Sequence, residues 1–164
     1  MKGNGVSPRD NPRVIALPPV LYGATLLPVL ALDWLWPLRV LQQSMAFWLG
    51  VALLLVGAGI GVWGQRTMGA GGTNVNPSEP TTAIVTGGPF RFSRNPLYVA
   101  LTLLYLGLCL AVNTGWGFLA LVPLLLIMHY GVVLREERYL EQKFGETYRQ
   151  YRGKVRRYLP VGFT

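Results

Sequence analysis

The run "PLYVALTLLYLGLCLAVNTGWGFLALVPLLLIMHYGVVL", residues 96–134, decides the fold. It is 39 residues long and contains no Asp, Glu, Lys or Arg. As one helix it would measure roughly 58 Å at 1.5 Å per residue, about twice the thickness of a bilayer's hydrocarbon core. The "NTG" at 113–115 favours a turn near its middle. The run therefore predicts a helical hairpin with transmembrane helices at 96–112 and 116–134.

Two further spans are predicted on the N-terminal side. Residues 14–32 carry no charge, and Pro18 and Pro19 would fall in the first helical turn, where a missing N–H costs little. Residues 44–64 are also uncharged and include "GAGIGVWG", whose glycines suit close helix packing in lipid. We therefore expect an all-α fold, a polytopic membrane helix bundle of about four spans that forms one integral membrane domain over residues 1–164.

The composition supports a bilayer protein. Only 13% of the residues are charged, and Lys and Arg outnumber Asp and Glu by 15 to 7. In a membrane protein such an excess marks cytoplasmic segments, so we do not expect nucleic-acid binding. The single cysteine, Cys109, allows no intrachain disulfide and no Cys-based metal site. The N-terminus lacks the short apolar core of a signal peptide, so we expect the first apolar stretch to remain in the mature protein.

The basic residues predict the orientation of the bundle. Fourteen of the 15 lie before residue 14, in the loop 65–95 or in the tail 135–164, which leaves only Arg39 between the first two spans. The positive-inside rule therefore places both termini, the loop and the tail in the cytoplasm. In an antiparallel hairpin, the start of the third span and the end of the fourth lie at the same face. We expect "FSRNP" (92–96) to meet "LREERYL" (134–140) there, with two arginines facing two glutamates.

The residues before the third span have both ordinary and functional explanations. Asn95 is suited to cap a helix that begins at Pro96. Arg91 and Arg94 could anchor the helix to lipid phosphates, or they could form half of a binding site. Glu136 could be an ordinary solvated carboxylate, but its place opposite Arg94 makes it and the next glutamate candidates for ligand binding.

His129 is the single histidine and lies within the predicted fourth span. An ionisable residue there is a functional candidate by default, although a neutral histidine bonded to a neighbouring helix explains it equally well. It precedes Glu136 by seven residues, so both should lie on one helix face. No second His or Cys stands at metal-ligand spacing, so we expect no metal site.

The tail "LREERYLEQKFGETYRQYRGKVRRYLP", residues 134–160, is helical in pattern. Apolar and aromatic residues recur every three to four positions, and Gly145 is expected to divide the tail into two short helices. A basic amphipathic tail of this kind suits an anionic membrane surface. In the loop before the third span, "TTAIVTGGPF" (81–90) is expected to be a short extended piece.

Together, these segments resemble the isoprenylcysteine carboxyl methyltransferase and phospholipid methyltransferase family of integral membrane enzymes. The resemblance covers residues 81–160. It combines Arg-x-Pro-x-Tyr (Arg94, Pro96 and Tyr98), a downstream Glu-Glu, and a Phe-Gly…Tyr…Tyr tail. It implies methyl transfer from S-adenosylmethionine to a lipid-like acceptor that enters from the bilayer, with membrane lipids as partners. The oligomeric state stays open.

The resemblance also implies roles for individual residues. Arg94 matches the arginine that addresses the substrate carboxylate, and we expect Arg94 and Asn95 to be catalytic. We expect the cofactor to be bound by Gly88, Pro89, Arg91, Pro96, Tyr98, His129, Arg135, Glu136, Glu137 and Tyr148. Arg157, in the tail, is expected to matter far less than Arg94.

Several acceptors and two other functions stay open. The leading acceptor is the carboxylate of an isoprenylated cysteine or analogue, followed by a phospholipid amine or a small thiol. A rival from another enzyme class is an NADPH-dependent sterol-type reductase, which resembles this family around a similar hairpin. A non-catalytic membrane protein is the third possibility.

Overall fold

The computed structural model describes residues 11–76 and 79–158, and within them every regular element is helical. This confirms the all-α prediction. The predicted extended piece at 81–90 forms no strand in the described chain, and a short 3-10 helix occupies its end. In chain order the helices are α1 (Pro18–Leu35), α2 (Gln43–Ala70), η1 (Gly88–Arg91), α3 (Pro96–Val112), α4 (Trp116–Met128), the π-helical η2 (His129–Val133), α5 (Leu134–Phe144) and α6 (Glu146–Lys154).

Three helical segments are long and apolar enough to cross a bilayer, namely Pro18–Leu35, Gln43–Ala70 and Trp116–Phe144. The helix α3 is apolar but, at 17 residues, shorter. Its bounds match the predicted 96–112, whereas α2 continues beyond the predicted end at 64. The count of four spans and their orientation stay predictions; Lys2 and Arg9, which the orientation used, lie outside the described residues.

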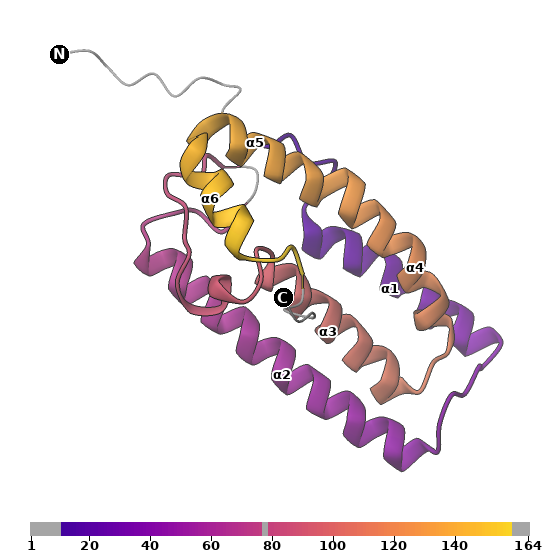
Figure 1. Ribbon diagram of the computed structural model, residues 1–164. Coiled ribbons are helices and arrows are strands. Elements are labelled where there is room, and N and C mark those ends of the chain that lie inside the picture. Colours follow the sequence, from indigo (N-terminus) through magenta and orange to yellow (C-terminus); the bar gives the residue numbers. More distant parts are fainter. Residues whose placement is uncertain (1–10, 77–78, 159–164) are drawn as a thin grey trace.

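Glycines bring α2 and α3 into close contact along their length (Figure 1). A Cβ added to Gly50 would lie 2.5 Å from the Ala111 nitrogen and 2.6 Å from the Gly107 oxygen. Within "GAGIGVWG", an added Cβ at Gly57 or Gly64 would also meet α3 residues at 3.0 Å or less. The predicted role of these glycines in close packing is therefore confirmed.

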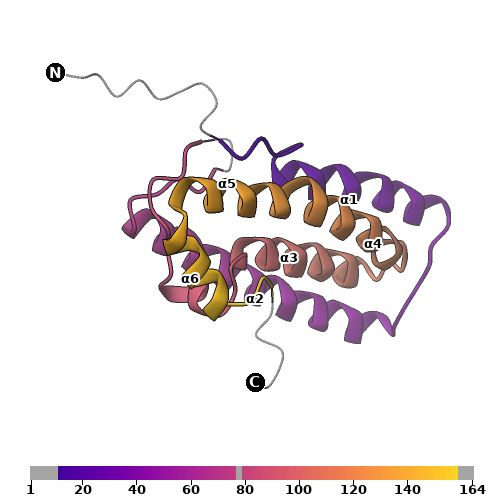
Figure 2. The same cartoon turned by 45° about the horizontal axis from the view of Figure 1, so that its top comes forward.

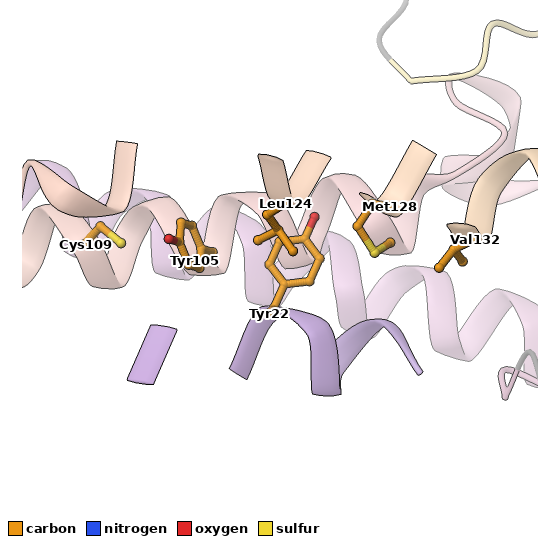
Figure 3. Close-up of a cluster of buried hydrophobic side chains, with 6 residues drawn as sticks. All are labelled: Tyr22, Tyr105, Cys109, Leu124, Met128 and Val132. Carbon is orange, nitrogen blue, oxygen red and sulfur yellow. The ribbon is translucent and has the colours of Figure 1, made fainter. Parts of the chain in front are cut away.

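A row of buried side chains joins α1 to the α3–α4 hairpin (Figure 3). Tyr22 of α1, Tyr105 of α3 and Leu124 of α4 belong to this row, and the rings of the two tyrosines meet edge to face at 6.0 Å. The Tyr22 hydroxyl also hydrogen-bonds the Thr102 hydroxyl at 2.7 Å. This contact fixes α1 against the face of α3 that α2 leaves free.

At one end of the bundle, a polar cluster ties the α1–α2 connection to the α3–α4 turn. Asn113 adopts a left-handed conformation (φ 61°), and its side-chain oxygen accepts hydrogen bonds from the backbone nitrogens of Val40 and Leu41, both at 3.1 Å. Arg39 pairs with the buried Asp33 at 3.1 Å and donates to the Val112 carbonyl. The single basic residue between the first two spans is thus a structural one.

The other end of the bundle collects α5, α6 and the segment 71–95 (Figures 1 and 2). Gly145, with φ 53°, separates α5 from α6, as predicted. The π turn of η2 lets the Gly131 carbonyl accept a bond from the Ile15 nitrogen at 3.2 Å. The chain before α1 is thereby fastened to the joint between α4 and α5.

Replacing Gly50 with Ala should destabilise the protein. The new methyl group would overlap the backbone of α3, and overpacking of this kind costs about 1–3 kcal/mol. Gly59→Ala is the matched control, because a Cβ there meets nothing within 4 Å. Thermal unfolding in detergent should show a lower midpoint for Gly50→Ala and an unchanged or higher one for Gly59→Ala. Equal midpoints would contradict the packing described here.

Candidate functional site

A cavity opens where the segment 71–95, the start of α3 and the helices α5 and α6 meet. We call it the donor pocket. Apolar residues line it, among them Met68 near the end of α2, Val75, Ile84, Leu97 and Leu140. Of the residues predicted from the sequence, those that line it are Arg94, Asn95, Pro96, Tyr98, Glu136, Glu137 and Tyr148. The expectation that the two ends of the hairpin would meet at one face is confirmed.

Glu137 is the centre of the charged cluster in the donor pocket. Its Oε1 lies 3.1 Å from the Arg94 Nη1, and both side chains are 9% exposed. Arg157 donates to both carboxylate oxygens, from Nε at 2.9 Å and from Nη2 at 2.8 Å. The hydrogen bonds to Glu137 raise the pKa of Arg157, so the guanidinium stays charged. One buried carboxylate is therefore shared by two arginines. Arg157 binds it in the bidentate geometry that makes such pairs strong.

The position of Arg157 bears on an expectation from the sequence. Arg157 was expected to matter far less for methyl transfer than Arg94, yet both bind the same carboxylate. Arg157 reaches Glu137 because the chain reverses after Gly145 and returns to the start of α3. No local pattern around Arg157 indicates this contact.

Glu136 lies beside this cluster but is held differently. The Tyr98 hydroxyl donates to its Oε1 at 2.7 Å. No lysine or arginine of the described residues forms an ion pair with it. Neighbouring glutamates thus differ, since one is neutralised by two guanidinium groups and the other keeps only a neutral hydroxyl as its partner. The pocket therefore offers an uncompensated carboxylate to a cationic ligand.

Arg94 has one donor that the described residues do not use. Its Nη1 contacts Glu137 and donates to the Tyr148 hydroxyl at 3.4 Å, whereas its Nε is buried without a hydrogen-bond partner. Leaving a buried donor unpaired costs about 1–3 kcal/mol. The pocket therefore also offers a donor to an anionic or carbonyl group of a ligand.

Two tyrosines of α6 form an aromatic wall. Tyr148 and Tyr151 are both buried, with ring centroids 6.3 Å apart, and the Tyr151 hydroxyl donates to the Phe90 carbonyl at 2.7 Å. Burial raises the pKa of both tyrosines, so their hydroxyls stay protonated. The apolar face predicted for the tail thus covers the donor pocket, and α6 acts as its wall.

Several predicted cofactor residues do not line the donor pocket. Gly88, with φ 55°, lies where a Cβ would be 2.5 Å from the Thr67 Oγ1, so it sets η1 close against α2. Arg91 is exposed and lies over the ring of the next residue, at 4.5 Å from the ring centroid. Arg135 donates to the Arg13 carbonyl at 2.9 Å. The residues outside the pocket are Gly88, Pro89, Arg91, His129 and Arg135.

Asn95 has a different role from the expected helix cap. The helix α3 does begin at Pro96, but the Asn95 side chain makes no capping hydrogen bond. Its Nδ2 donates instead to the Arg157 carbonyl at 2.9 Å. Asn95 therefore holds the returning tail in place at the edge of the donor pocket.

His129 does not share a face with Glu136, contrary to the prediction. The π turn of η2 lies between them, and its wider turn removes the seven-residue repeat of an α-helix. His129 lines a second, mostly apolar groove, where its Nδ1 lies 2.7 Å from the Tyr158 hydroxyl. We call this the apolar groove; it is lined by Tyr22, Tyr98, Val99, Thr102, Leu103, Leu106, Leu125, Leu126, Met128, His129, Val133 and Tyr158. Tyr98 lines both cavities.

Comparison with known proteins identifies the family. The family model described as phospholipid methyltransferase matches residues 45–147, which include Arg94, Tyr98, Glu136 and Glu137. An uncharacterized protein of Haemophilus influenzae (strain ATCC 51907 / DSM 11121 / KW20 / Rd) is 38% identical over 63 residues, which are 38% of this chain and all of that protein. No solved structure is significantly similar. The chain belongs to the phospholipid methyltransferase family.

Proposed function

We propose that this protein is a membrane methyltransferase that uses S-adenosylmethionine and acts on a lipid-like acceptor. Family membership supports methyl transfer in general. The observation that carries the choice of cofactor is the pairing, in one pocket, of the uncompensated Glu136 with the unused Nε of Arg94. S-adenosylmethionine carries a cationic sulfonium and a carboxylate, so it matches both groups.

The residues of the donor pocket are suited to hold such a cofactor. Arg94 would donate from its Nε to a carboxylate oxygen, either of the cofactor or of the acceptor. Glu136 would attract the cationic part or accept bonds from the ribose hydroxyls, as acidic residues do in dinucleotide sites. The faces of Tyr148 and Tyr151 would attract the cation through their π-electrons. Bound there, the cofactor supplies an electrophilic methyl group that needs little acid–base assistance. The protein's task is then to orient the two reactants and exclude water.

The apolar groove supports a lipid-like acceptor. It follows α3 from Tyr98 to Leu106, and Tyr98 also lines the donor pocket. A hydrocarbon chain in the groove would therefore end beside the cofactor. The leading acceptor is the carboxylate of an isoprenylated cysteine or analogue, because Arg94 matches the arginine that addresses this group. A phospholipid amine is the second candidate and is favoured by the family description; a small thiol is the third. A labelled methyl donor, supplied with each acceptor in turn, distinguishes them.

Calorimetric titration of the purified protein in detergent tests the cofactor first. We expect S-adenosylhomocysteine to bind with a micromolar dissociation constant and NADPH not to bind, because the donor pocket pairs one carboxylate with one free guanidinium donor. Binding of NADPH alone would replace the proposal with a sterol-type reductase. Absence of binding by both, in folded protein, would support a non-catalytic membrane protein.

Replacing Glu136 with Gln should weaken S-adenosylmethionine binding about 10-fold, since contacts to a charged group contribute about 1.5–3 kcal/mol. The matched control is Glu146→Gln, which changes a carboxylate whose side chain is 68% exposed at the start of α6. Titration of both variants under the same conditions is the measurement. Equal affinities in the two variants would remove Glu136 from the cofactor site.

Replacing Arg94 with Gln should reduce methyl transfer at least 10-fold, because the change removes the unused Nε and one of the two cations that neutralise Glu137. Arg91→Gln should leave the rate near that of the parent protein, because Arg91 is exposed outside the pocket. The initial rate with labelled donor compares the two. A larger loss in Arg91→Gln would contradict the placement of the site.

A further inference from the structure

The segment that follows α6 crosses the start of α3 (Figure 1). We call residues 155–158 the C-terminal strap. It begins in an extended conformation, with φ −122° and ψ 133° at Val155. The Arg156 carbonyl accepts a bond from the Arg94 nitrogen at 2.9 Å, and the Arg157 carbonyl accepts bonds from Ser93 Oγ at 3.2 Å and Asn95 Nδ2 at 2.9 Å. The strap is therefore fastened to the residues that lead into α3.

Two neighbouring side chains of the strap make contacts that belong to different cavities. Arg157 binds both oxygens of Glu137, which lines the donor pocket. Tyr158 lines the apolar groove and meets His129 Nδ1 at 2.7 Å. Tyr158 thus lines the apolar groove directly, while Arg157 reaches the donor pocket only through Glu137.

The contact between Tyr158 and His129 is a polar pair in an otherwise mostly apolar groove. Most of the other lining side chains are aliphatic, and the Tyr22 and Thr102 hydroxyls bond to each other. Burial raises the pKa of Tyr158, so its hydroxyl keeps its proton and can act as donor or acceptor. Tyr158 is 36% exposed, so a ligand can reach the pair, and a polar group that enters an apolar groove needs a hydrogen-bond partner. The polar part of an amphiphile in the groove would find one at this pair.

We propose that the C-terminal strap links the two sites: Tyr158 determines acceptor recognition, and Arg157 is a positioning residue that orients Glu137 at the donor pocket. The ligand class assigned to Tyr158 is a single-chain amphiphile whose polar head hydrogen-bonds to the Tyr158–His129 pair. This inference rests on the proposed function for the identity of the donor ligand.

The test measures two ligands on the same full-length variants in detergent. The ligands are S-adenosylhomocysteine and an isoprenylated cysteine analogue, each titrated by calorimetry. Tyr158→Phe should weaken binding of the amphiphile about 10-fold and leave S-adenosylhomocysteine within about 2-fold, as expected for loss of one hydrogen bond. Arg157→Gln should show the reverse pattern, and Arg157→Lys should recover part of the lost affinity.

Two controls separate recognition from folding. Tyr130→Phe removes an exposed hydroxyl next to His129, and Arg149→Gln removes a 59% exposed guanidinium from α6. Neither should change either affinity. In addition, Tyr158→Phe combined with His129→Phe should weaken amphiphile binding no more than either change alone, since the two side chains form one pair.

The outcomes distinguish failure of the inference about the strap from failure of the proposed function. If both affinities fall together in each strap variant, the strap has only a structural role and the inference is wrong. If neither affinity changes, the inference is also wrong. If the parent protein fails to bind S-adenosylhomocysteine, the proposed function is rejected. In that case, the amphiphile affinities of the parent protein and of Tyr158→Phe still show whether Tyr158 recognises the amphiphile.

Discussion

The ion-pair cluster around Glu137 is the interaction on which the end of the bundle formed by α5, α6 and the start of α3 depends. It joins three segments that are distant in sequence, because Arg94 precedes α3, Glu137 lies in α5 and Arg157 follows α6. Removing one partner of a buried ion pair costs about 3–5 kcal/mol, since it leaves an uncompensated charge. The donor pocket therefore keeps its shape only while all three side chains are in place.

The close contact between α2 and α3 helps to fix the position of that cluster. With Gly50 and Gly107 at the interface, the two backbones approach nearly as closely as helices can. This rigid pair fixes where α3 begins, and with it the direction in which Arg94 and Tyr98 enter the pocket. The π turn of η2 then sets the other wall, because it rotates α5 relative to α4 and turns Glu136 towards Tyr98. The positions of these two walls, the start of α3 and α5, are thus determined by backbone features outside the pocket.

The sequence was sufficient to predict the hairpin, the bounds of α3 and the encounter of Arg94 with Glu137. These depend on the length of an uncharged run and on antiparallel geometry, both of which are local properties. It could not place His129 or Arg157. The π turn has no sequence signature, and because of it His129 lines the apolar groove instead of the helix face that carries Glu136. Arg157 reached Glu137 through a chain reversal whose end point depends on tertiary contacts with Ser93 and Asn95.

The two cavities differ in polarity in a way that suits a reaction between a water-soluble donor and an amphiphile. Charged residues line the donor pocket, namely Arg94, Glu136 and Glu137, and Arg157 binds Glu137, while the apolar groove holds hydroxyls and one histidine among aliphatic side chains. A charged ligand would lose its hydration in the groove without compensation, and a hydrocarbon chain would gain nothing from the buried ion pairs. Differences in solvation would therefore favour a separate cavity for each ligand, and Tyr98 lines both cavities.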